Sequence, residues 1–168
     1  MVIEAIGRHL RLGVVGGGPG SVIGDVHRAG ARLDGYYDIV AAALSSDPER
    51  SRQTGRAIGV SAERAYPSWR ELVKSEVKRK DRIDVIAVMT PNDSHYEICC
   101  AALDVGFHII CDKPLTTDLA SAASLAKKVK NSGLEFCLTH SYTAYPMVRQ
   151  ARAMIRKGAI GAIRQLHL

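Results

Sequence analysis

The sequence has few aromatic side chains: one tryptophan, two phenylalanines and six tyrosines, 5% of 168 residues. Basic residues gather at 74–80 and 127–130, but no aromatic residues alternate with them, as they do on many nucleic-acid-binding surfaces. Both basic clusters are typical of solvated helix faces and helix ends, where cations suit the helix dipole. The net charge of +6 is modest. We therefore expect no nucleic-acid partner, although a basic nucleic-acid surface is the alternative.

Long apolar runs are absent too: none approaches the ~18 residues that a membrane helix needs. Residues 1–6 lack the pattern of a signal peptide. No Cys/His spacing supports zinc, and no GxSxG motif or Ser/His/Asp arrangement is visible, so no metal is expected. The cysteines show no CxxC spacing, with two on an expected helix and two in expected buried strands, and they predict reduced thiols in a cytoplasmic protein. They are Cys99, Cys100, Cys111 and Cys137. No membrane partner is expected, because no apolar run is long enough to span a bilayer.

Strand and helix patterns alternate along the whole chain. The hydrophobic content of 46% suits one globular domain with a real core, since a chain of ~150 residues buries roughly 70% of its unfolded surface. Repeated strand–helix units with short connections predict an α/β fold, a doubly wound parallel sheet with helices on both faces. Expected strands cover 11–15, 37–44, 64–66, 84–89, 108–111 and 135–139, and a further strand begins at 162–168. Expected helices cover 21–33, 94–105, 118–131 and 147–157, and two more start at 47–48 and 68.

A glycine-rich turn follows the first expected strand. It contains Gly16, Gly18, Gly20 and Ser21, and a strict GxGxxG register from Gly16 would put the third glycine at Ser21. The turn is therefore expected to be longer than usual, with Gly24 closing it against the helix. Such a turn lets the backbone approach a pyrophosphate while helix amides point at the charge. The preceding strand and following helix favour dinucleotide binding over a plain glycine turn.

The end of the second expected strand selects between cofactors. An acidic residue there would bind the adenosine ribose diol and repel a 2′-phosphate. This sequence has Ser45 and Ser46, followed by Arg50, and hydroxyls and a guanidinium suit a phosphate. We expect NAD or NADP, with a slight preference for NADP. Asp47 before Pro48 could serve the diol or cap a helix, and the whole segment could simply start that helix.

Further candidates follow the later strands, whose carboxyl ends face the ligand in open parallel sheets. Thr90, Pro91, Asn92 and His95 form a turn that is expected to face the cofactor, although such a turn is also a good helix start. After the sixth strand, His140 and Tyr142 are candidates for contacts with substrate or nicotinamide; packing is the alternative. His27 is expected to be a packed or capping residue.

Lys113 is the candidate catalytic residue after the fifth expected strand. Oxidation of an alcohol needs a proton removed as hydride leaves, and an ammonium near a nicotinamide can orient the oxygen and take part in that transfer. The alternative is an ordinary surface lysine.

These pieces resemble the Gfo/Idh/MocA family of oxidoreductases over residues 11–168. The matching segments are 24–27, 90–95, 102–114 and 158–164. The resemblance implies that Lys113 is the catalytic lysine of the family's Glu-Lys-Pro motif, written here Asp112, Lys113 and Pro114. It also implies that Asp112 points towards the nicotinamide ribose, and that the 90–95 turn contacts the cofactor.

The family oxidises or reduces sugars, cyclitols and similar polyols, so the resemblance implies an NAD(P)-dependent oxidoreductase acting on such a small molecule. Redox-assisted elimination or glycosidic cleavage, and a non-catalytic dinucleotide-binding module, are the alternatives. The family also has a C-terminal α+β substrate domain, which this sequence lacks. We therefore expect an NAD(P)-binding Rossmann domain over 1–160, the first residues of the substrate domain over 161–168, and a homo-oligomeric full-length protein. The sequence departs from the family at the longer glycine turn, at Ser45, and at Ser141 and Thr143.

Overall fold

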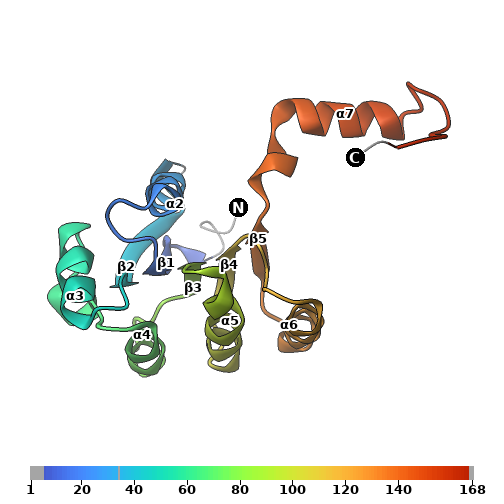
Figure 1. Ribbon diagram of the computed structural model, residues 1–168. Helices are drawn as coiled ribbons and strands as arrows, with labels where there is room; N and C mark the ends of the chain where they lie inside the picture. The colour runs from blue at the N-terminus through green and yellow to red at the C-terminus, as the bar shows by residue number, and fades with distance from the viewer. Residues whose placement is uncertain (1–5, 34, 167–168) are drawn as a thin grey trace. The chain divides into compact units, whose positions relative to one another are not determined.

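The computed structural model describes residues 6–33 and 35–166 and contains a five-stranded sheet in the order β2-β1-β3-β4-β5 (Figure 1). The pairs β1–β2, β1–β3 and β3–β4 run parallel. In the sheet, β2 lies on one side of β1, and β3, β4 and β5 follow in order on its other side. This is the doubly wound order expected from the sequence. The strands are β1 (Leu10–Gly16), β2 (Tyr37–Ala43), β3 (Val85–Met89), β4 (His108–Asp112) and β5 (Phe136–Thr139).

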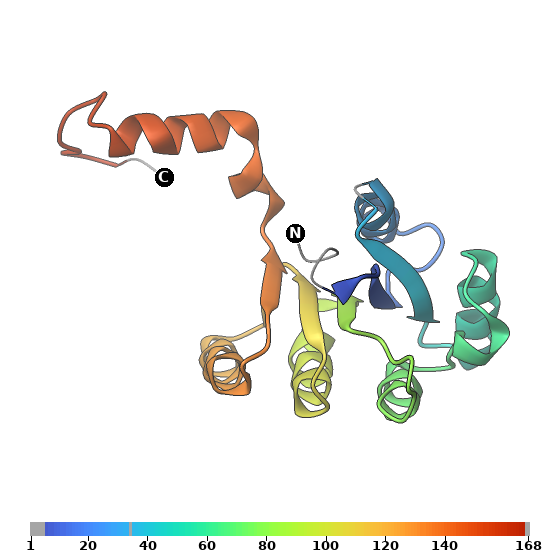
Figure 2. The same cartoon turned by 180° about the vertical axis from the view of Figure 1, so that it is seen from behind.

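Helices connect the strands and flank the sheet. Figures 1 and 2 show α4, α5 and α6 side by side on one face, with α2 on the opposite face. Apart from the strands expected over 64–66 and 162–168, the expected helix and strand bounds agree with the structure to within one residue. The helices are α2 (Val22–Leu33), α3 (Pro48–Ala57), α4 (Trp69–Glu76), α5 (His95–Asp104), α6 (Leu119–Ser132) and α7 (Pro146–Arg156). Short 3-10 helices are η1 (Ala62–Arg64), η2 (Asn92–Ser94) and η3 (Ser141–Ala144).

Polar side chains cap the starts of helices in the described part of the chain. Asp47 accepts a hydrogen bond from the Arg50 amide at 2.7 Å, and the Ser68 hydroxyl accepts one from the Glu71 amide at 3.2 Å. Asp118 caps α6 in the same way. Each bond satisfies an amide that has no partner within the helix. The helix starts expected at Asp47 and Ser68 are confirmed.

The core lies on both faces of the sheet, and β3 is buried along its whole length. Its side chains alternate, so Ile86 and Val88 join the cluster on one face, while Val85 and Ala87 join the cluster on the other. A strand buried on both faces must be apolar throughout.

The third expected strand is reduced to a single bridge between Ala42 and Ala65. Side chains hold this segment instead of a ladder. The fully buried Glu76 accepts hydrogen bonds from Arg64 at 2.6 and 2.9 Å and from the Tyr66 hydroxyl at 2.8 Å. Burial, and then the Glu76 carboxylate, raise the pKa of Tyr66.

The chain divides into two compact units, Met1–Leu138 and Thr139–Leu168. The second unit contains η3 and α7. Residues 162–166 form no strand, so the strand expected over 162–168 is wrong for its described part, and residues 167 and 168 lie outside the described residues. The backbone groups of a strand need a neighbouring strand as partner. The boundary expected near residue 160 stays a prediction about the full family architecture.

Two further findings concern the burial of the cysteines and the length of the apolar helices. Cys137 is exposed on β5, so its expected burial is wrong: β5 is an edge strand, whereas Cys111 on β4 is buried. No helix in the described part of the chain is both long and apolar enough to cross a bilayer.

Candidate functional site

The glycine turn between β1 and α2 brings two stretches of backbone into direct contact. Gly16 and Gly17 have φ angles of +75° and +63°, in the left-handed region that favours glycine. A Cβ atom on Gly24 would lie 1.9 Å from the carbonyl oxygen of Gly17, so only glycine fits there. The expectation that Gly24 closes the turn against the helix is confirmed.

Arg28 holds the same carbonyl group through its side chain. Its Nη1 donates a hydrogen bond to the Gly17 oxygen at 2.5 Å, and its Nη2 lies 2.6 Å from Asp25. The side chain is 7% exposed, which is unusual for arginine. Sequence reasoning missed Arg28 because a basic residue within a surface helix is ordinarily solvated.

The remaining residues predicted to hold a diphosphate form the outer part of the turn. A Cβ on Gly18 would lie 2.7 Å from the carbonyl oxygen of Leu44, so the turn passes close to the end of β2. Gly20 is exposed, with φ of +87°. The Ser21 hydroxyl accepts a hydrogen bond from the Gly24 amide at 3.2 Å, and therefore shapes the entry into α2.

A pocket of about 480 Å³ opens where β1, β2 and β3 end. Turns that are far apart in the sequence meet there, as expected at the carboxyl edge of a parallel sheet. Its size lies within the range of small-molecule sites. Of the residues predicted to bind cofactor, those that line it are Gly16, Ser45, Ser46, Thr90 and Pro91.

Several other cofactor candidates do not line this pocket, and two of them are solvent-exposed. Arg50 is exposed on α3, and Asn92 is exposed at the start of η2. Asp47, which the sequence left open as a ribose ligand, uses its carboxylate to cap α3. The pocket therefore presents serine hydroxyls at the end of β2.

Trp69 and Arg70 at the start of α4 line the same pocket and were missed. The Arg70 guanidinium lies 4.3 Å from the centre of the Trp69 ring and forms an ion pair with Glu97. The capping signal at Ser68 located this helix start. No sequence pattern indicated that the sheet would bring it beside β2.

Asp112 ends β4, the next strand along the sheet, and Lys113 and Pro114 follow it; Lys113 is exposed. His27 of α2 lies 3.9 Å from the Asp112 carboxylate, with its side chain 11% exposed. Burial lowers the pKa of His27, and the nearby carboxylate offsets part of that effect. His27 is thus a packed residue, as expected, and it faces the turn that carries Lys113.

His95 is fully buried between the turns that end β3 and β4. Its Nδ1 lies 2.8 Å from the carbonyl oxygen of Pro114, and its Nε2 lies 3.0 Å from that of Thr90. Burial alone would lower the pKa of His95, but its interactions with Cys111 and with the two carbonyl groups outweigh it and raise the pKa to about 9.

The pKa of the Cys111 thiol, which interacts with this histidine, is also shifted. Hydrogen bonding from Cys99, opposed by burial and assisted by His95, lowers the pKa of Cys111 to about 6. Its interaction with Cys111 and its own burial raise the pKa of Cys99. Both cysteines are buried.

His140 and Tyr142, the predicted substrate contacts, belong to the second unit and are exposed there. The Tyr142 ring packs edge-on against Tyr145 at 5.7 Å. Their contacts with substrate stay predictions.

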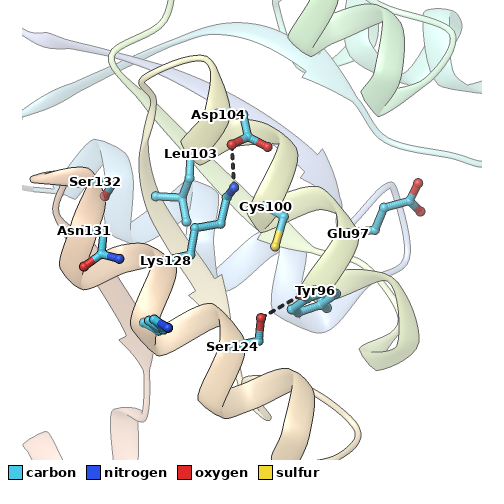
Figure 3. A pocket seen from close by; sticks show the side chains of 10 residues that line it. Tyr96, Glu97, Cys100, Leu103, Asp104, Ser124, Lys128, Asn131 and Ser132 are labelled. Carbon is cyan, nitrogen blue, oxygen red and sulfur yellow. Dashed lines mark hydrogen bonds and ion pairs between the residues drawn. The ribbon is translucent and has the colours of Figure 1, made fainter.

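A second, open groove lies between α5 and α6 (Figure 3). Lys128 pairs with Asp104 at 2.5 Å, and the Tyr96 hydroxyl lies 3.0 Å from Ser124. None of the residues predicted to bind cofactor or substrate lines it. We interpret it as the surface groove that remains between two packed helices. Within residues 6–33 and 35–166, no group of three or more His, Cys, Asp or Glu side chains is placed to hold a metal ion.

The doubly wound sheet, the glycine turn and the strand-end pocket define a Rossmann-type dinucleotide-binding domain. The model of the oxidoreductase family with an NAD-binding Rossmann fold (GFO_IDH_MocA) matches residues 10–140. The chain therefore belongs to the Gfo/Idh/MocA family of oxidoreductases, as its sequence motifs predicted.

Individual relatives agree with this assignment. The chain is 40% identical over 164 residues to the uncharacterized oxidoreductase YfiI of Bacillus subtilis, covering 97% of this chain and 42% of the relative. An inositol dehydrogenase homolog from Azotobacter vinelandii, solved with NADH and myo-inositol, is 39% identical with a TM-score of 0.90, over 94% of this chain and 41% of that one. An oxidoreductase from Sinorhizobium meliloti is 50% identical with a TM-score of 0.87, over 94% and 44%. The chain thus spans about two fifths of the length of these relatives.

Proposed function

We propose that this chain is the cofactor-binding part of an NAD(P)-dependent oxidoreductase that transfers hydride between a sugar or polyol and the nicotinamide ring. The observation that carries the proposal is the pocket at the ends of β1, β2 and β3, with Lys113 on the turn after the neighbouring strand β4. The Azotobacter vinelandii homolog bound to NADH and myo-inositol supports the substrate class.

The residues at the strand ends fit such a cofactor. The glycines of the turn carry no side chains, so a diphosphate could lie against their backbone and against the amides of α2. We assign the diphosphate to Gly16, Gly18, Gly20 and Ser21. The adenosine would occupy the pocket, between the β2 end with its two serines and the turn of Thr90, Pro91 and Asn92.

We propose a preference for NADP over NAD at the end of β2. Ser45 and Ser46 line the pocket, and Asp47, the nearest carboxylate in sequence, is engaged in capping α3. Hydroxyl groups suit a 2′-phosphate, whereas a carboxylate would repel it. Arg50 could add a charged contact by a change of side-chain rotamer, since it is exposed.

Lys113 is the residue that we assign to proton transfer. When bound, the nicotinamide supplies or accepts the hydride. The Lys113 ammonium would orient the substrate oxygen and hold the proton that this oxygen loses or gains. Asp112 would bind the nicotinamide ribose, and Pro114 completes the turn. His140 and Tyr142 are proposed substrate contacts.

Calorimetry with NADH and NADPH tests the binding step. Absence of binding to both, by a folded sample, would refute the proposal. Turnover needs the longer chain that the relatives possess, and there Lys113→Ala should abolish hydride transfer, whereas Lys130→Ala, an exposed lysine on α6, should not. Unchanged turnover in Lys113→Ala would end the catalytic assignment.

The same assay separates the alternatives. A dehydrogenase forms one reduced cofactor for each substrate oxidised. A redox-assisted elimination or glycosidic cleavage regenerates its cofactor and forms product without net reduction. A non-catalytic module binds cofactor and forms no product. We also propose a cytoplasmic location, because none of the four cysteines forms a disulfide, and a homo-oligomeric full-length protein.

A further inference from the structure

His95 joins two turns through backbone oxygens. One ring nitrogen meets the carbonyl oxygen of Thr90, at the end of β3, and the other meets that of Pro114, just beyond Lys113. The ring is fully buried, so neither bond competes with solvent. With both nitrogens used in this way, the ring has none left for a direct hydrogen bond to a cofactor.

The two bonds have a consequence for the charge of the ring. A carbonyl oxygen only accepts hydrogen bonds, and a neutral imidazole has a single N–H donor. In a neutral ring, one nitrogen lone pair would face a carbonyl oxygen at 3.0 Å or less. Both bonds are satisfied only when both nitrogens carry a proton. The ring is then an imidazolium, whose hydrogen bonds are charge-assisted and stronger than neutral ones.

The surroundings of the ring favour this charge. The titratable groups that act on it are Cys111 on β4 and, through Cys111, Cys99 on its own helix α5. Two neighbours act in turn on Cys111. The hydrogen bond from Cys99 lowers the pKa of the Cys111 thiol, whereas Asp112, the next residue in the sequence, raises it. The pKa of His95 is raised mainly by Cys111 and to a smaller extent by the two carbonyl contacts, which together outweigh the effect of burial.

We propose that His95 is a positioning residue, a buried imidazolium that fixes the Lys113 turn to the Thr90 turn and thereby sets the place of Lys113 relative to the cofactor pocket. The effect of this clamp on the cofactor rests on the proposed function, in which Lys113 acts on the nicotinamide side. The turn at Thr90 lines the adenosine side, and the turn of Lys113 follows the next strand. Loss of the clamp should therefore affect the nicotinamide half more than the adenosine half.

The first test needs no cofactor. Nitrogen-15 NMR of the histidine rings in the free chain at pH 7 should show both nitrogens of His95 protonated, and this state should persist to about pH 8. A neutral His95 ring at pH 7 would overturn the proposal. Because the measurement uses the unaltered chain, it is decisive even if no substitution at His95 folds, and even if no cofactor binds.

The second test compares NADH with ADP-ribose, which lacks the nicotinamide. His95→Ala should weaken NADH binding about tenfold and ADP-ribose binding less than about threefold, because only one half of the ligand meets the displaced turn. His95→Gln, which can still donate to one carbonyl, should fall in between. Leu125→Ala, which removes another fully buried side chain, controls for lost stability. Equal losses for both ligands, or losses no greater than the control's, would overturn the positioning role. If the unaltered chain bound neither ligand, the proposed function would fail instead.

Discussion

Replacement of Gly24 by alanine tests whether the backbone contact behind the glycine turn is required. The added Cβ would lie 1.9 Å from the Gly17 carbonyl oxygen, 2.6 Å from its carbonyl carbon and 2.8 Å from its Cα. All three are backbone atoms, so no side-chain rotation relieves the overlap. The Gly17 oxygen is also held by the buried Arg28, which opposes movement of the turn.

Two effects of opposite sign decide the magnitude. Alanine is favoured over glycine within a helix by about 1 kcal/mol. Against this, the Cβ and the Gly17 oxygen must separate from 1.9 Å to the 3.4 Å at which ordinary contact begins. Overpacking of a rigid site costs about 1–3 kcal/mol and occasionally more. Because backbone has to move, we expect the upper end, and a net loss of about 2 kcal/mol in the free energy of unfolding.

Gly30→Ala is the matched control. It makes the same chemical change in the same helix α2, but a Cβ at Gly30 meets nothing within 4 Å. Helix propensity then acts alone, and the free energy of unfolding should rise by about 0.5–1 kcal/mol. The two alanine variants should therefore move stability in opposite directions.

Urea and thermal unfolding measure the stability, and NADH calorimetry measures the affinity. Gly24→Ala should lower Tm by roughly 4–8 °C and weaken NADH at least about tenfold, since the displaced turn no longer fits a diphosphate. Gly30→Ala should leave NADH affinity unchanged. If Gly24→Ala were as stable as the unaltered chain and bound NADH equally well, the contact would not shape the site. If Gly30→Ala were equally destabilising, the loss would not come from the contact.

Three further predictions concern the core, the pH dependence and the cofactor preference. Glu76→Gln, which removes the buried charge that pairs with Arg64 and leaves it the more exposed Asp81, should lower the free energy of unfolding by about 3–5 kcal/mol in urea titrations; a loss below about 1 kcal/mol would contradict it. Burial raises the pKa of Asp84, but hydrogen bonds from Arg8 and from the backbone outweigh it and hold the pKa below its usual value. Asp84 therefore stabilises the fold above its unfolded pKa, and this contribution is lost as the pH falls through the folded pKa. Between about pH 5 and pH 2, Asp84→Asn should lose less stability than the unaltered chain. Equal slopes of unfolding free energy against pH would refute this. Ser45→Asp should raise the ratio of NADH to NADPH affinity about tenfold in calorimetry, and an unchanged ratio would remove Ser45 from cofactor selection.

The fold was predictable because its signals are local. The apolar run of β3 and the caps at Asp47 and Ser68 fixed element types and bounds to within one residue. The third strand was overestimated because Arg64 and Tyr66 serve a buried hydrogen-bond network with Glu76, which no periodicity reports. Tertiary contacts overrode local pattern at that point.

The site was predictable in its backbone and less so in its side chains. Gly24 was identified from its spacing after the turn. A position where two stretches of backbone touch requires glycine, and that glycine is visible in the sequence. Trp69, Arg70 and Arg28 were missed because their roles depend on which elements the sheet brings together. His95 was assigned to a cofactor-facing turn, and only the structure shows both of its nitrogens against backbone oxygens.

Helix α2 connects the two ends of the proposed cofactor site. Arg28 holds the Gly17 carbonyl in the glycine turn, and the preceding residue, His27, lies 3.9 Å from Asp112 beside Lys113. Adjacent helical residues point about 100° apart, so one helix reaches both turns at the same level. A displacement of α2 would therefore move the diphosphate turn and alter the support of the Lys113 turn together. This arrangement explains why a backbone contact as small as that of Gly24 is expected to control affinity for the whole dinucleotide.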